Sequence, residues 1–187
     1  MRKFVLVLPF VCLAALYGQE LLTNGDFEQE LTVGWTQTQA GSGYKVCDRN
    51  QTYHPDADYE AKDSLYDGAG WNKLSQLVDV PGPLLELSFW ASFAYGAGSS
   101  TCWPVASVTV EYYDLNSTLL GETRFYWHSP YCNWTPSPTL SLHEVTNPDW
   151  TEYTLDIPTE LSQNLPGVNP DDIARVAVSL YTYTSGG

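Results

Sequence analysis

Short segments in which apolar and polar side chains alternate are the feature that most constrains the fold of this chain. The clearest are Leu84–Tyr95, Val105–Asp114 and Asp172–Tyr183. Because successive side chains of a β-strand point to opposite faces, each segment predicts a strand with one face in a core and one outside it. The side chains predicted to face the core in the last two are Val108, Val110, Tyr112, Val176, Val178 and Leu180.

Further runs of β-branched and aromatic residues lie between turn signals such as Pro81-Gly82. A long stretch, 128–148, carries four prolines, which argue against a strand there. Helical periodicity is confined to Pro170–Ala174. The pattern predicts an all-β, antiparallel two-sheet β-sandwich with Leu84–Tyr95 as its central strand. The other strands are expected at Tyr44–Asp48, Ser64–Tyr66, Leu74–Val80, Leu119–Trp127 and Trp150–Ile157.

Length and charge limit the number of domains and the classes of partner. A chain of 187 residues with 43% hydrophobic content has room for one domain with a proper core. Eight Lys and Arg against 22 Asp and Glu give a formal net charge of −14. Such a charge repels phosphate backbones and anionic lipid surfaces. We therefore expect neither nucleic acid nor membrane as a partner.

The first 18 residues have the organisation of a secretory signal peptide. Arg2 and Lys3 precede an apolar run, Phe4–Leu16, which is too short for a transmembrane helix. Cleavage is expected before Gln19, so that residues 19–187 form the mature domain. The predicted location is therefore secreted, either extracellular or at the cell surface.

Export to an oxidising compartment permits disulfides among Cys47, Cys102 and Cys132. Cys102 follows one predicted strand and Cys132 follows two more, so an up-and-down chain returns both loops to the same end of the sandwich. We expect a disulfide between Cys102 and Cys132, which leaves Cys47 reduced or bonded to another segment. Metal binding by these cysteines is the weaker alternative, because no Cys-x-x-Cys or nearby His spacing supports it.

The stretch Leu21–Trp35 reads LLTNGDFEQELTVGW and predicts a first strand that stops at an Asn-Gly turn. Together with the segments SFWASFAY, VTVEYYDLNSTLLGE, NPDWTEYTLDIP and ARVAVSLYTYTSGG, it resembles the CenC-type carbohydrate-binding modules. The resemblance extends along most of the mature chain. It implies a jelly roll of the galactose-binding-like superfamily and a non-catalytic module that binds a polysaccharide or oligosaccharide.

The resemblance also implies a structural Ca²⁺ site. Carried over from the family motif, the ligands are Glu28 with the carbonyl of Asp26, and Glu60 with the carbonyl of Asp63. Oxygen ligands of this kind suit Ca²⁺. The alternative is that Glu28 and Glu60 are solvated surface carboxylates.

Sugar binding requires an aromatic platform and polar side chains in the same place. Trp71 is the platform candidate by its position in the resemblance, and its alternative role is to plug one end of the core. Arg124 and Tyr126 alternate outward on one predicted strand, and Ser179 and Tyr181 do so on another. A Tyr-rich face that simply lies under loops is the alternative for these four residues.

Catalysis has little support in the sequence, because no strand carries the paired carboxylates of a glycosidase. The expected function is to target a larger hydrolase or surface protein to polysaccharide. The alternative is a structural or adhesive β-sandwich of a surface protein without sugar binding. Modules that resemble this chain end in a strand after the Gly-rich turn, whereas this sequence stops at Gly187. We therefore expect a truncated module with its final strand, and further domains, beyond that residue.

Overall fold

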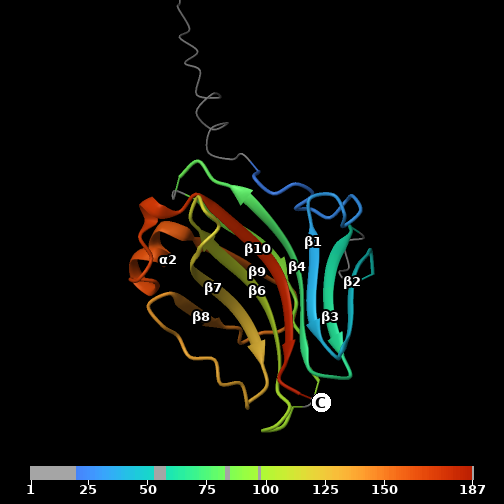
Figure 1. Cartoon of the computed structure of the whole chain (residues 1–187). Helices are drawn as coiled ribbons and strands as arrows, with labels where there is room; N and C mark the ends of the chain where they lie inside the picture. Colours follow the sequence, from blue (N-terminus) through green and yellow to red (C-terminus); the bar gives the residue numbers. More distant parts are fainter. Residues whose placement is uncertain (1–19, 53–57, 83–84, 97, 187) are drawn as a thin grey trace, which may run out of the picture.

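The computed structural model describes residues 20–52, 58–82, 85–96 and 98–186 and is nearly all β. The predicted signal peptide, 1–18, lies outside the described residues. Figure 1 shows one large sheet with strands packed behind and beside it. The strands are β1 (Thr36–Gly41), β2 (Tyr44–Asn50), β3 (Glu60–Tyr66), β4 (Gly70–Asp79), β5 (Glu86–Ala91), β6 (Pro104–Tyr113), β7 (Leu119–His128), β8 (Leu140–Glu144), β9 (Thr151–Asp156) and β10 (Arg175–Thr184). These strands confirm the predicted all-β sandwich.

The large sheet has the strand order β1-β4-β10-β6-β7-β8. β10 lies between β4 and β6 and is antiparallel to both, with Val178 opposite Gln76 on one side and Val110 on the other. The pairing of β7 with β8 is parallel, so the sheet is not antiparallel throughout.

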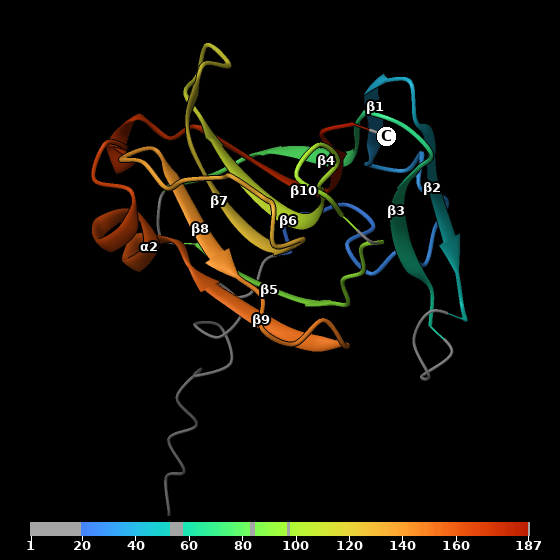
Figure 2. The same cartoon turned by 90° about the horizontal axis from the view of Figure 1, so that it is seen from below.

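The second layer consists of two separate ribbons, β2–β3 and β5–β9. Figure 2 shows β5 and β9 packed below the large sheet and β2 and β3 at its other end. A cavity of about 1250 Å³ lies between the ribbons, lined by β3, the end of β5 and the inner side of β6 and β10. Leu180 and Ala106 line this cavity and are only partly buried. The second layer is therefore incomplete over this part of the inner face.

The core lies between the large sheet and the β5–β9 ribbon. All six side chains predicted to face inward belong to it, five of them buried and Leu180 packed against the others. Val110 and Tyr112 are fully covered. Phe89 of β5 contacts Phe125 edge to face, with ring centroids 5.3 Å apart, which joins the two layers through aromatic contact.

Three sequence predictions about the elements were wrong. β5 is not central but belongs to a two-stranded ribbon, because its residues pair only with β9 among the described strands. β8 lies inside the proline-rich stretch, because Leu140–Glu144 itself contains no proline. An unpredicted helix, α2, covers Ile157–Asn164. Asp156 is its N-cap, and the Asp156 side chain accepts a hydrogen bond from the Thr159 backbone amide. A short 3₁₀ helix occupies Pro170–Asp172, within the segment where helical periodicity was expected.

The N-terminal stretch is also not a strand over its described residues, which form turns up to Trp35. Asn24 organises it from a buried position, with its Nδ2 donating to the carbonyls of Gln29 and Glu30 and its own carbonyl accepting from Trp35 Nε1. Phe27 packs on Trp35 with ring centroids 5.0 Å apart. Asn24 and Phe27 have positive φ angles, which extended strands do not permit. Within the part of the chain described, no helix is long and apolar enough to span a bilayer.

Candidate functional site

The five residues predicted to bind sugar share the outer face of the large sheet, the face away from the core. Strand alternation places them there, because their neighbours Leu180, Val178 and Phe125 point into the core. Trp71 comes from β4 and the other four residues from β7 and β10, so strands distant in sequence bring them together. The five are Trp71, Arg124, Tyr126, Ser179 and Tyr181.

Four aromatic rings form a row across this face. Trp71 stacks on Tyr181 with centroids 6.4 Å apart and an interplanar angle of 27°. Trp134, from the loop after β7, lies 6.4 Å from Tyr181 and 5.6 Å from Tyr126. Trp134 was not among the residues predicted to bind sugar, because nothing in the sequence of its loop indicates which way the side chain turns. We refer to Trp71, Tyr181, Trp134 and Tyr126 as the aromatic row.

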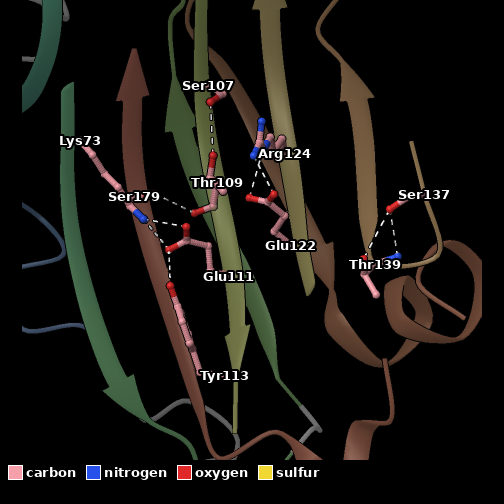
Figure 3. Close-up of polar contacts among 10 residues, drawn as sticks. All are labelled: Lys73, Ser107, Thr109, Glu111, Tyr113, Glu122, Arg124, Ser137, Thr139 and Ser179. Carbon is pink, nitrogen blue, oxygen red and sulfur yellow. Dashed lines mark hydrogen bonds and ion pairs between the residues drawn. The ribbon is translucent and has the colours of Figure 1, made fainter. Parts of the chain in front are cut away.

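Arg124 lies beneath the aromatic row and is held from two sides. Its guanidinium donates to both carboxylate oxygens of Glu122, at 2.7 and 3.1 Å, and lies 4.2 Å from the centre of the Trp134 ring. Figure 3 shows the Arg124–Glu122 pair beside Thr109 on the neighbouring strand. A bidentate pair capped by an aromatic ring fixes the guanidinium plane.

A second ion pair crosses the same face. Lys73 Nζ reaches from β4 over β10 to both carboxylate oxygens of Glu111 on β6, at 2.7 and 2.6 Å (Figure 3). Tyr113 donates its hydroxyl to the same carboxylate at 3.2 Å. Glu111 lies directly opposite Glu122 in the strand register. The outer face therefore carries two adjacent ion pairs, neither of which was predicted from the sequence.

The floor between these pairs consists of small hydroxyl residues. Ser179, Thr109 and Ser107 are 0%, 4% and 4% exposed. Ser107 and Thr109 hydroxyls lie 3.3 Å apart, and Ser179 Oγ donates to the Thr109 carbonyl at 3.5 Å. Ser179 thus lies on the predicted face, but its hydroxyl is buried and hydrogen-bonds to the neighbouring strand.

The tyrosines of the face remain protonated at neutral pH. Burial raises the pKa of Tyr181 to about 12, and burial together with the charge of Glu111 raises the pKa of Tyr113 to about 12. Their hydroxyls can therefore donate and accept hydrogen bonds.

The structure places two of the segments predicted to bind Ca²⁺ next to each other, the one with Glu28 and the start of β3. Glu28 accepts a hydrogen bond from the Tyr59 backbone amide at 2.9 Å, which places its carboxylate at the start of β3, beside Glu60. The ligand predicted from Asp63 is its carbonyl, and its side chain accepts hydrogen bonds from Asn72 and Thr182. Burial raises the pKa of Asp63 to about 6, although these hydrogen bonds lower it. Over the described residues, no group of three or more His, Cys, Asp and Glu side chains could hold a metal ion.

The predicted Cys102–Cys132 disulfide is absent, and the three cysteines of the described residues are all unbonded. Cys102 Sγ faces the end of β10, where it contacts Thr184 and the carbonyl of Gly186. Cys47 lies against Asp63 and Asn72, and burial raises its pKa to about 12, aided by the charge of Asp63. A thiol with that pKa is a poor nucleophile.

Comparison with known proteins gives similarity in structure but not in sequence. No family model matches the chain, and no curated protein matches it. The enzymatically active domain of tailspike protein 4 of bacteriophage CBA120 is similar with a TM-score of 0.52 and 16% identity, over 89% of this chain and 20% of that one. A structure described as carbohydrate-binding modules from the β-sandwich superfamily is similar with a TM-score of 0.51 and 13% identity, over 90% of this chain and 60% of that one.

This chain therefore spans about a fifth and about three fifths of the two matched chains. At identities this low, the likeness concerns the fold alone. The chain has a β-sandwich fold that is also found in carbohydrate-binding modules.

Proposed function

We propose that this protein is a non-catalytic carbohydrate-binding module of the CenC type that binds an extended glycan on its outer face. The observation that carries the proposal is the aromatic row, which places four rings from four segments across one face, three of them half-buried and Tyr126 buried behind Trp134. Flat aromatic faces stack on the apolar faces of sugar rings. The hydroxyls of Tyr113 and Tyr181 and the two ion pairs supply the hydrogen-bonding groups that a sugar also needs.

The same geometry favours binding over hydrolysis. Glycosidases use two carboxyl groups. One of them is the general acid, which donates its proton to the glycosidic oxygen. Glu111 and Glu122 are adjacent on the outer face, but each is engaged by the cation of an ion pair, Lys73 for Glu111 and Arg124 for Glu122. Carboxyl oxygens that are engaged by a cation in this way are not placed to act on a glycosidic oxygen.

Export and attachment to a larger protein belong to the same proposal. The basic and apolar residues at the N-terminus support export. The module would then hold a secreted hydrolase or a surface protein on its polysaccharide.

The Ca²⁺ site is a further part of the proposal, with a structural role. The position of Glu28 beside the start of β3 supports it, since a cation held by Glu28 and Glu60 would tie the N-terminal stretch to β3. Addition of CaCl₂ to the chelator-treated domain should raise its Tm, and Glu28→Gln should abolish that rise. An equal Tm with and without calcium would exclude the site.

A final strand that completes the second layer is also proposed. The cavity between β3 and β5 supports it, because each of these strands has one edge that no described strand pairs. Fusing a strand of seven alternating residues, the length of β3, after Gly187 should raise the Tm. The same fusion with a central proline is the control, since proline removes a ladder hydrogen bond. Equal Tm values for the two fusions would contradict the proposal.

The test of sugar binding is isothermal titration of the mature domain with soluble β-glucans, xylans and mannans. Binding should disappear in Trp71→Ala and Trp134→Ala and persist in Trp90→Ala, which removes a 59% exposed tryptophan from the other layer. If a folded domain releases no heat with any glycan, the sugar-binding proposal fails. A structural or adhesive β-sandwich is then the better explanation.

A further inference from the structure

If the outer face binds glycans as proposed, its ion pairs also determine whether it accepts charged or uncharged glycans. Two basic side chains, Lys73 and Arg124, lie near the aromatic row, and each forms an ion pair with a glutamate. The side chains are 19% and 12% exposed in the Lys73–Glu111 pair and 19% and 16% in the Arg124–Glu122 pair. Pairs this well covered are only weakly screened by salt, so they persist at the surface that a ligand meets.

The other two basic side chains near the face either lie apart from the aromatic row or lie beside a carboxylate. Arg175 donates to the carbonyls of Asp114 and Leu115 in the turn after β6, away from the aromatic row. His128 lies 3.4 Å from the carboxylate of Glu144, which is 64% exposed. An anionic sugar therefore meets paired cations and an exposed carboxylate.

An ion pair at the surface is, in contrast, a good partner for a sugar hydroxyl. A hydroxyl donates one hydrogen bond and accepts others. It can donate to Glu111 or Glu122 while it accepts from the cation of the same pair. A carboxylate or sulfate on the sugar has no proton to donate and must compete with the glutamate for the cation.

We infer that Glu111 and Glu122 are specificity-determining residues, which restrict the outer face to uncharged glycans by neutralising Lys73 and Arg124. The cations are thereby kept as hydrogen-bond donors without becoming an anion site. Removing either carboxylate should therefore change the class of ligand as well as the affinity.

The experiment compares the wild-type domain with Glu122→Gln and Glu111→Gln against two kinds of probe. The probes are polygalacturonate and the neutral β-glucan, xylan or mannan that the wild type binds. We expect the wild type to bind polygalacturonate at least tenfold more weakly than the neutral polymer. Glu122→Gln should gain at least tenfold in affinity for polygalacturonate at low salt and lose that gain at high salt. Glu152→Gln is the matched control, because it makes the same charge change at an exposed position on β9.

The two variants test the inference separately, because Glu122→Gln leaves Arg124 unpaired and Glu111→Gln leaves Lys73 unpaired. If one variant unfolds, the other still decides the outcome. Folding of each variant is checked by its thermal transition. A wild type that binds polygalacturonate as tightly as the neutral polymer overturns the inference but leaves sugar binding intact. Absence of a gain in both folded variants, or an equal gain in Glu152→Gln, also overturns it. A wild type that binds no neutral glycan refutes the proposed function itself.

Discussion

Replacing Glu160 with glutamine should destabilise the protein in a way that depends on pH. Glu160 is on α2 and only 4% exposed, and its carboxylate joins the helix to the large sheet. It accepts hydrogen bonds from His143 Nε2 at 2.9 Å, from Thr123 at 3.0 Å and from Asn164 at 2.8 Å. Tyr112, which donates to or accepts from Thr123, completes the buried network.

The magnitude follows from the pKa of this carboxyl group. Burial alone would raise the pKa of Glu160, but the hydrogen bonds from His143, Ser141 and Asn164 outweigh burial and lower it from 4.5 to about 2. At about 1.4 kcal/mol for each pH unit, this corresponds to about 3 kcal/mol of free energy of unfolding. Because the pKa is lower in the folded state, the contribution is present above about pH 4.5 and is lost as the pH falls toward 2.

Urea denaturation at pH 7 and at pH 3 measures this contribution. Glu160→Gln should lower the free energy of unfolding by about 2–3 kcal/mol at pH 7, and the difference from wild type should shrink at pH 3. Glu152→Gln, an exposed carboxylate on β9, is the control and should cost less than about 0.5 kcal/mol. A loss in Glu160→Gln that is the same at both pH values would refute the electrostatic reasoning and leave a packing effect.

Three further outcomes are expected. Leu161→Ala, at a side chain 1% exposed, should lower the free energy of unfolding by about 3 kcal/mol in urea denaturation. Asp156→Ala should remove the cap of α2 and lower the Tm, at a cost of about 1 kcal/mol; an unchanged Tm would mean that the cap contributes nothing. Thiol titration of the unreduced, denatured mature domain should find three thiols, Cys47, Cys102 and Cys132, and a value near one would reveal a disulfide.

The sequence predicted the strands best where the apolar side chains of a strand lie on one face. β6 and β10 each have an apolar face in the core and a more polar outer face, so their inward and outward residues were correctly separated, although Thr109, Glu111 and Ser179 of the outer face are also buried. The same alternation turned Arg124 and Tyr181 outward, whereas Trp71 was chosen from the family resemblance. The order of strands in the sheet was not predictable, because alternation says which face a side chain takes but not which strand is its neighbour.

The missed features depend on contacts that no local pattern encodes. Glu111 and Glu122 are in register only because β6 and β7 pair as they do, and Lys73 reaches Glu111 only because β10 lies between β4 and β6. The helix α2 did leave a local signal, an aspartate followed by Pro158 near the first turn, but eight residues are too few for a clear helical period. Asn24 overrides the apolar run of the N-terminal stretch with a network of hydrogen bonds.

The place of β10 determines when the protein can fold during its synthesis. β10 is the last described strand along the chain, yet it separates β4 from β6 in the large sheet. Its Leu180 pairs with Leu74, more than a hundred positions earlier. Until β10 leaves the ribosome, β1–β4 and β6–β7–β8 are two fragments with exposed edges, which are prone to aggregate. Pairings of such long sequence separation also form slowly. The large sheet therefore cannot be completed until the residues of β10, Arg175–Thr184, have left the ribosome.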